Sequence, residues 1–210
     1  MINRLFSSSE RKQMSGDPRL PAALHPCELS QLFAAISAVQ PRRMIEWGSG
    51  GTTLVIPGTF QSIERYVSVE HNEQWHARVG KVVDDPRVSS LFRPPHASAP
   101  EPAMFEESGG KTRQEYVDWT ERCENEREIL ESYVEAPFEI EDEYDVALID
   151  GRARRFCIER AWQGVRSGGL LLIHDSQRGD YKAVVRGLGG GQPLWLEPWH
   201  RGQVCVLRRP

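Results

Sequence analysis

Carboxylates, a histidine and a glycine-rich run stand in this sequence where buried segments end, and such residues can bind ligands and move protons. Glu46-Trp47-Gly48-Ser49-Gly50-Gly51-Thr52 joins an acid to a turn whose glycines let a ligand approach the backbone. Glu70 follows a second apolar run, Asp150 a third, and His174-Asp175 a fourth. The acids and the histidine could accept a proton from an acceptor hydroxyl or hold a metal ion.

These residues fall at the carboxyl ends of predicted strands. Apolar runs and alternation predict strands at 43–47, 65–70, 88–92, 144–149 and 170–173, with a closing hairpin of 194–199 and 203–207 joined by Arg201-Gly202. Helices are predicted at 28–39, from 52 onward, at 72–83, 111–134, 155–165 and 180–188. The alternation implies a Rossmann-like three-layer α/β/α sandwich with a mostly parallel sheet and an antiparallel C-terminal hairpin strand. Ligands of such sheets bind beyond the carboxyl ends of the strands.

Glu70 and the glycine turn favour an adenosine ligand. Glu70 lies 22 residues after Gly48, at a strand end where its carboxylate can accept both ribose hydroxyls. A dinucleotide turn would have a third glycine where this chain has Thr53, and Glu46 beside a pyrophosphate would cost several kcal/mol in rough Coulomb terms. The cationic S-adenosylmethionine fits Glu46 better. Glu46 as a solvated strand-end charge and Glu70 as a helix-capping acid remain the simpler interpretations.

The chain resembles the class I S-adenosylmethionine-dependent methyltransferases over roughly residues 40 to 210. The matching segments are 46–51, Val69-Glu70, 145–151 and 168–173. The resemblance implies a seven-stranded sheet whose last strand lies antiparallel inside it, a ribose held by Glu70, and a transferable methyl near Asp150. The candidate cofactor residues are Glu46, Trp47, Gly48, Ser49, Gly50, Gly51, Thr52, Glu70, His71 and Asp150.

The candidate catalytic residues are Asp150, His174 and Asp175. A catechol-type O-methyltransferase would pair an acid like Asp150 with Asp-Asn after the next strand, and this chain has His174 and Asp175 there. We therefore assign no metal, although a divalent ion stays open. Segments 69–75 and 173–178 are also similar to polysaccharide (glucuronoxylan-type) O-methyltransferases, which makes His174 a candidate base. A plain turn at Asp150 and a backbone-bonded strand end at His174 are the alternatives.

Charge is unevenly distributed along the chain. Residues 101 to 145 hold 16 Asp/Glu and 4 Lys/Arg, which leaves 14 and 22 for the rest. We expect a partly ordered arm at 1–26 and one domain at 27–210 with an acidic helical insertion at about 95–143, acting as a lid or a partner surface outside the nucleotide pocket. Arginines 152, 154 and 155 make the expected acceptor mouth basic, which favours an anionic acceptor.

Composition excludes several classes. With 39% hydrophobic and 27% charged residues in 210, the chain is expected to fold as a globular protein, not as a disordered or membrane protein. A net charge of −4 disfavours a nucleic-acid binder. Four scattered cysteines support neither a zinc site nor a disulfide framework, and with no signal segment the protein is expected in the cytoplasm.

The sequence predicts an S-adenosylmethionine-dependent methyltransferase acting on an oxygen of a small or sugar-like acceptor, with an anionic one favoured by the basic mouth. The alternatives are a non-catalytic interaction protein with this fold and, less favoured because of Thr53 and Glu46, a nicotinamide-dependent oxidoreductase. A homo-oligomer remains open.

Overall fold

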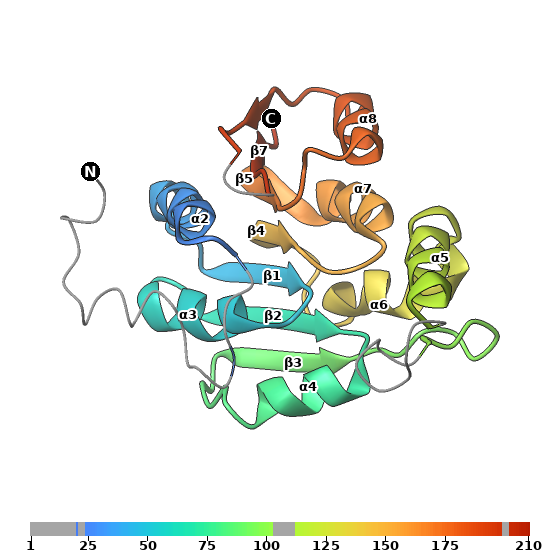
Figure 1. The fold of residues 1–210 in the computed structure, drawn as a ribbon. Coiled ribbons are helices and arrows are strands. Elements are labelled where there is room, and N and C mark those ends of the chain that lie inside the picture. Colours follow the sequence, from blue (N-terminus) through green and yellow to red (C-terminus); the bar gives the residue numbers. More distant parts are fainter. Residues whose placement is uncertain (1–19, 21–23, 103–111, 199–201) are drawn as a thin grey trace.

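A single sheet of seven strands organises the residues that the computed structural model describes, namely 20, 24–102, 112–198 and 202–210 (Figure 1). The strands are β1 Arg43–Trp47, β2 Arg65–Glu70, β3 Val88–Phe92, β4 Tyr144–Ile149, β5 Val165–Ile173, β6 Pro193–Trp195 and β7 Cys205–Arg208. Their order in the sheet is β3-β2-β1-β4-β5-β7-β6. Strands β1 to β5 are parallel, and β7 runs antiparallel between β5 and β6. The predicted fold class is confirmed.

The register of the central strands brings their carboxyl ends to one edge. Trp47 pairs with Val69 on one side and with Ile149 on the other, and Ile149 pairs with Ile173. The hydrogen bonding between β1 and β4 continues one residue beyond β4. There the amide of Asp150 donates to the Trp47 carbonyl at 3.0 Å. The residues that follow β1, β4 and β5 are therefore neighbours.

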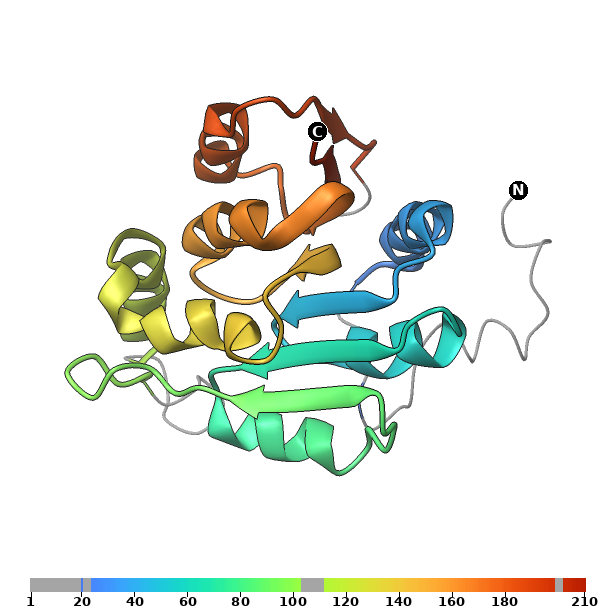
Figure 2. The ribbon, with the colours of Figure 1, turned by 180° about the vertical axis from the view of Figure 1, so that it is seen from behind.

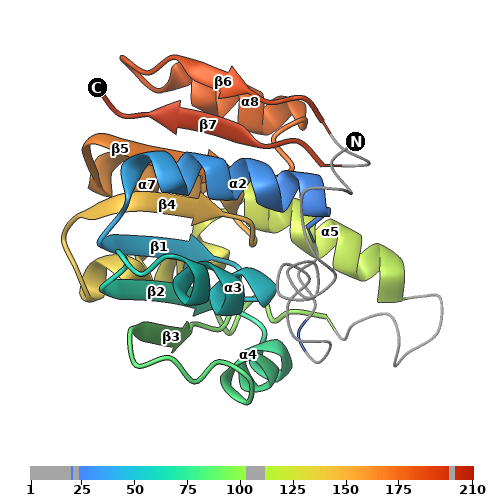
Figure 3. The ribbon, with the colours of Figure 1, turned by 90° about the vertical axis from the view of Figure 1, so that its left-hand side faces the viewer.

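Helices cover both faces of the sheet. They are α2 Pro26–Val39, α3 Gly51–Thr59, α4 Glu73–Gly80, α5 Thr112–Asn125, α6 Glu131–Glu135, α7 Arg154–Gly164 and α8 Gly179–Gly187, with 3-10 turns η3 Arg127–Ile129 and η4 Ala136–Glu139. Helices α2 and α3 pack on one face, seen in front in Figure 3. Helices α5 to α8 pack on the other, on the left in Figure 2. In the described part of the chain, no helix is long and apolar enough to cross a membrane.

Helix α2 begins at Pro26, two residues before the predicted start at 28, and a capping arrangement precedes it. Pro26 occupies the first turn, where its missing N–H costs nothing. The His25 side chain accepts a hydrogen bond from the Cys27 amide at 3.2 Å, and the Glu28 carboxylate accepts one from the His25 amide at 2.9 Å. These contacts fix the position of Glu28, whose side chain is buried.

The helix expected at 111–134 is wrong as one continuous element. Helix α5 ends at Asn125, and the chain passes through Glu126 in an extended conformation before η3 and α6. Ile129 and its neighbour Leu130, which follow this break, are both buried. The register of β5 against β4 also shifts, so that β5 begins at Val165, earlier than the predicted 170.

Two predictions at the ends of the chain fall on residues that the structure does not describe, and a third differs from the structure in length. The arm expected at 1–26 lies almost entirely outside them. Arg201, half of the predicted turn of the C-terminal hairpin, lies outside as well, while Gly202 is described. The paired segments of that hairpin are shorter than predicted, at 193–195 and 205–208.

The four cysteines are free in this structure, and Cys123, Cys157 and Cys205 are buried. Burial raises the pKa of Cys123 and of Cys205 to about 12, so that neither is a thiolate near neutral pH.

Candidate functional site

The turn after β1 is built on close backbone contact. Gly48 has φ +95°, and a Cβ there would lie 2.6 Å from the Cα of Gly151 in the turn after β4. The carbonyl of Ser49 accepts a hydrogen bond from the Trp75 indole N–H at 2.6 Å. A Cβ at Gly50, which precedes the first residue of α3, would meet nothing within 4 Å. The turn is thus held firmly at Gly48 and open at Gly50.

Glu46 lies beneath this turn and is fully buried. Its carboxyl group accepts hydrogen bonds from the hydroxyls of Thr52, Thr53 at 2.5 Å and Ser68 at 2.9 Å. Burial raises the pKa of Glu46 to about 7 against the lowering effect of these hydroxyls. The carboxyl group is thus surrounded by protein hydroxyls, so Glu46 shapes the turn from below. Its attraction for the cationic cofactor stays a prediction. Thr53, which stands where a dinucleotide turn would have glycine, has a structural role of its own.

Trp47 is a core residue through its side chain. The indole is buried, and its N–H donates to the carbonyl of Tyr133 at 3.1 Å. Only the backbone of Trp47 is therefore available to a ligand at the turn. The hydroxyl of Ser49 similarly pairs with that of Ser68 at 2.7 Å, inside the protein.

Glu70 and His71, at the end of β2, form a second buried group. Glu70 Oε1 accepts the amides of His71 at 2.9 Å and Asn72 at 2.8 Å and lies 2.9 Å from His71 Nδ1. Its other oxygen, Oε2, takes part in none of these three contacts. Burial lowers the pKa of His71, but the carboxylates of Glu101 and Glu70 raise it more. Glu70 thus binds the two amides that precede α4, whereas the helix is capped by the Asn72 side chain, which accepts the Trp75 amide at 2.8 Å.

The acidic segment is not separate from these residues. The ring of Trp119, in α5, stacks on that of His71 with centroids 5.8 Å apart, and Tyr133, in α6, meets it edge-on at 5.7 Å. Both aromatic side chains belong to the core on this face of the sheet. The aromatic face of the segment therefore packs against a candidate cofactor residue, and deleting the segment would remove part of the core. Its role as a lid or a partner surface outside the nucleotide pocket stays a prediction.

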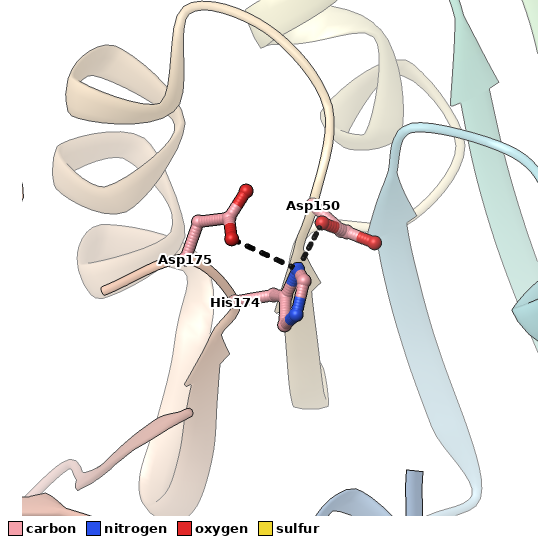
Figure 4. A group of neighbouring side chains, drawn as sticks. All are labelled: Asp150, His174 and Asp175. Atoms are coloured by element: carbon pink, nitrogen blue, oxygen red, sulfur yellow. Dashed lines mark hydrogen bonds and ion pairs between the residues drawn. The ribbon is translucent and has the colours of Figure 1, made fainter. Parts of the chain in front are cut away.

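The three candidate catalytic residues meet where β4 and β5 end (Figure 4). His174 Nδ1 lies 2.8 Å from Asp150 Oδ1 and 3.9 Å from Asp175 Oδ1, so that the imidazole stands beside both carboxylates. Asp175 has φ +55°, a left-handed conformation that aspartate tolerates better than most residues. The sequence prediction that these side chains lie near each other agrees with this geometry.

Glu28 joins this group from α2, 146 residues away in sequence from His174. Its Oε2 lies 3.2 Å from His174 Nε2, so both ring nitrogens of His174 face carboxylates. Burial lowers the pKa of His174, but the hydrogen bond and charge of Asp150 and the charge of Asp175 raise it by more. The net effect is a raised pKa. The imidazolium form, with a proton on each nitrogen, suits this setting, whereas a general base needs a free nitrogen.

Arg154, the first residue of α7, is buried within the same group. Its guanidinium donates to the carbonyls of Gly151 at 2.9 Å, Asp150 at 2.9 Å and His174 at 2.8 Å. It also forms ion pairs with the carboxylates of Asp150 at 3.2 Å and Asp175 at 3.1 Å. Arg154 was predicted to line a basic mouth open to the acceptor, and this prediction is wrong because the side chain is only 6% exposed.

Neither Glu28 nor Arg154 was recognised as a site residue from sequence. Glu28 sits in the first turn of a helix, where an acid is ordinary, and Arg154 follows a predicted turn within a run of basic residues. The only available signal was position. Arg154 is four residues after Asp150, and a buried carboxylate needs a cation or several donors nearby.

Several solved structures share this fold. They include a methyltransferase-like protein from Silicibacter pomeroyi (TM-score 0.57, 18% identity, covering 91% of this chain and 90% of that one) and a caffeoyl-CoA O-methyltransferase candidate from Staphylococcus aureus (0.61, 12%, 98% and 94%). A third is a 16S rRNA N2 G1207 methyltransferase from T. thermophilus in complex with AdoMet and guanosine (0.54, 14%, 90% and 44%). The sequence matches no protein-family model and has no significant match among curated proteins. At these identities the likeness is one of fold.

Proposed function

We propose that this chain, which has the Rossmann-like fold of class I S-adenosylmethionine-dependent methyltransferases, binds S-adenosylmethionine and transfers its methyl group to an oxygen of a small or sugar-like acceptor, anionic acceptors included. The observation that carries the proposal is the pairing of the Gly48 turn with Glu70 at the ends of adjacent strands. The Gly48 amide donates to the Val69 carbonyl at 3.0 Å, which puts the turn directly beside the residue that precedes Glu70.

The turn and Glu70 fit an adenosine ligand in two respects. Among the described residues, no atom lies within 4 Å of a Cβ built on Gly50, which leaves the main chain there open to a ligand. Glu70 keeps Oε2 outside its contacts with His71 and Asn72, and that oxygen can accept a ribose hydroxyl. When bound, the cofactor supplies an electrophilic methyl on a sulfonium. The turn from Gly48 to Thr52 would hold it through the backbone, with Glu46 supporting the turn from below.

At the other end of the site, Asp150 is the residue we place closest to the reacting hydroxyl. Its Oδ1 is engaged by His174 and Arg154, which fix the carboxylate, and Oδ2 has neither of these contacts. We propose that Asp150 accepts the hydroxyl proton as the methyl moves, while His174 and Asp175 orient it. Oxygen is favoured over nitrogen because the chain has no N-P-P-Y-like segment after β4. A positioned base contributes about a hundred- to ten-thousand-fold to rate.

The first test is ligand binding by the full chain. Thermal melting and calorimetry with S-adenosylmethionine, S-adenosylhomocysteine and NAD⁺ are expected to show stabilisation by the first two only. Glu70→Ala should weaken S-adenosylhomocysteine by tens of fold, since losing a charge-assisted pair of hydrogen bonds costs about 2 to 3 kcal/mol. The exposed Glu73→Ala in α4 is the matched control and should bind like the parent. Equal affinities for the Glu70 variant and the parent would refute the cofactor assignment.

The second test concerns the reaction. With an acceptor in hand, Asp150→Asn should lower turnover by the factor expected of a positioned base and leave cofactor affinity unchanged. His174→Gln should lower turnover less, because a positioning role is indirect. If both variants methylate at the parent rate, the acceptor site is elsewhere and proximity alone would drive transfer.

Two other functions have definite signatures in the same assays. A folded protein that binds neither nucleotide would be the interaction protein of this fold, and one stabilised by NAD⁺ would be the oxidoreductase. The acceptor class needs its own comparison, because a protein of similar fold methylates 16S rRNA. Because the net charge is −4, we propose a small-molecule acceptor in preference to nucleic acid. We also propose that the protein is cytoplasmic and is either a monomer or a homo-oligomer.

A further inference from the structure

The group at the ends of β4 and β5 has the composition of a metal site. One ligand atom each from Asp150, His174 and Asp175 lies within 4.8 Å of the others. Two carboxylates and an imidazole are a ligand set that divalent ions such as Mn²⁺ or Co²⁺ accept. The residues that would hold a metal ion are therefore present. Whether an ion can bind depends on the other charged groups around them.

Arg154 already supplies a cation to this group. One guanidinium nitrogen, Nη1, lies 3.1 Å from Asp175 Oδ2, and the other, Nη2, lies 3.2 Å from Asp150 Oδ1. The guanidinium thus bridges the two carboxylates that a metal would have to share. His174 also faces Asp150 Oδ1 through its Nδ1, so this oxygen has two donors. An incoming ion would compete with both and would stand beside a buried positive charge.

The guanidinium is also fixed by the main chain. It donates to three carbonyls, of Asp150 and Gly151 in the turn after β4 and of His174 at the end of β5. Ala153, at φ +50°, turns the chain so that α7 begins with Arg154 at this point. The planar, five-donor guanidinium suits bridging in a way that a lysine ammonium does not. Swinging it away would leave buried carbonyls without donors.

We propose that Arg154 is the resident cation of this site, standing where a divalent metal would otherwise bind, and that the protein is metal-independent as a consequence. In this arrangement Arg154 is a positioning residue: it neutralises Asp150 and Asp175 and ties the β4 turn to the end of β5. The exclusion of a metal ion by Arg154 does not depend on the proposed function. Only the conclusion that methyl transfer needs no metal rests on that function.

The test is a metal titration of the full chain after treatment with a chelator. Calorimetry and thermal melting with Mn²⁺ and Co²⁺ should show no saturable binding to the parent protein below about 1 mM. Arg154→Ala should bind one equivalent of Co²⁺ roughly tenfold or more tightly than the parent, with visible absorption from a cobalt–imidazole site. Adding His174→Gln to that variant should abolish the absorption. Arg155→Ala is the matched control, since the neighbouring guanidinium bonds to Asn125, and it should behave like the parent.

Each result has a definite meaning. One equivalent of metal bound by the parent and lost in Asp150→Asn overturns the inference, as does a folded Arg154→Ala variant that binds no metal. If Arg154→Ala does not fold, Arg154→Met, which keeps the length of the side chain, replaces it, and the parent titration decides in either case. A parent protein that binds neither S-adenosylhomocysteine nor metal would refute the proposed cofactor while supporting this inference. Turnover that survives the chelator adds support once an acceptor is known.

Discussion

Replacing Glu46 with Gln should stabilise the protein at alkaline pH and have much less effect at acid pH. The carboxyl is fully buried beneath the glycine turn, and burial raises its pKa from 4.5 to about 7. A raised carboxyl pKa means that the folded state holds the proton more tightly than the unfolded state. The stability of the parent protein therefore falls as pH rises from about 4.5 through 7, where the buried group has to ionise.

The size of the effect follows from the shift. A change of one pKa unit corresponds to about 1.4 kcal/mol, so the free energy of unfolding should fall by about 3 kcal/mol between the protonated and ionised limits. Glutamine has nearly the shape of the protonated acid and can hydrogen-bond with the hydroxyls of Thr52, Thr53 and Ser68, but it does not ionise. Between pH 5 and pH 8.5, the variant should gain roughly 2 to 3 kcal/mol relative to the parent.

Urea unfolding of both proteins at pH 5 and at pH 8.5 measures this difference directly. The quantity of interest is the change in free energy of unfolding between variant and parent, compared across the two pH values, so that titrations elsewhere in the protein cancel. Glu159→Gln, an exposed glutamate of α7, is the matched control and should give the same difference at both pH values. A Glu46→Gln effect that is equal at pH 5 and pH 8.5 would refute the reasoning.

Three further substitutions test the packing around the site. Gly48→Ala should destabilise the fold by more than about 2 kcal/mol in chemical unfolding, because the new Cβ would meet the Gly151 backbone at 2.6 Å and alanine is strained at φ +95°; parent-like stability would show that the turns can separate. Gly202→Ala should cost about 1 to 3 kcal/mol in the same assay, because its Cβ would lie 2.4 Å from Glu28 Oε1 and 2.8 Å from His174 Nε2. Tyr133→Phe should change the free energy of unfolding by less than about 1 kcal/mol, since within the described residues its buried hydroxyl meets the Arg152 backbone and hydrogen-bonds no side chain; a large loss in melting temperature would refute this.

The strands of the parallel half were predictable because their sequences are nearly continuous apolar runs, as expected for strands covered on both faces. The predicted bounds at 43–47, 65–70 and 144–149 are those of β1, β2 and β4. Strand β5 was predicted short because Gly168 and Gly169 interrupt its apolar pattern, while the pairing of Val165 with Tyr144 extends it. The break after α5 was missed because buried residues there recur near helical spacing on both sides of it.

Some residues of the candidate site were predictable from the sequence, and others were not. Asp150, His174 and Asp175 follow strands directly, so topology alone predicted that they would meet. Glu28 and Arg154 were missed because their contacts depend on how α2 and α7 pack. Sequence position gives no sign that an arginine near a turn is buried between two carboxylates. The raised pKa of Glu46 was equally hidden, because it comes from full burial of the carboxyl group beneath the turn, which outweighs the lowering effect of the three hydroxyls.

The contact between the turns after β1 and β4 restricts how this sequence can diverge. A Cβ on Gly48 would meet the backbone of Gly151, and a Cβ on Gly151 would lie 2.8 Å from the backbone nitrogen of Gly48. A Cβ on Gly151 would also meet the Tyr133 hydroxyl, which a smaller side chain could relieve, but no side-chain change can relieve the main-chain collisions at either position. Among relatives that keep these turns in contact, the two glycines should therefore be retained together, and a relative that has lost one should show both turns rebuilt. The pair gives a criterion for recognising distant members when overall identity is low.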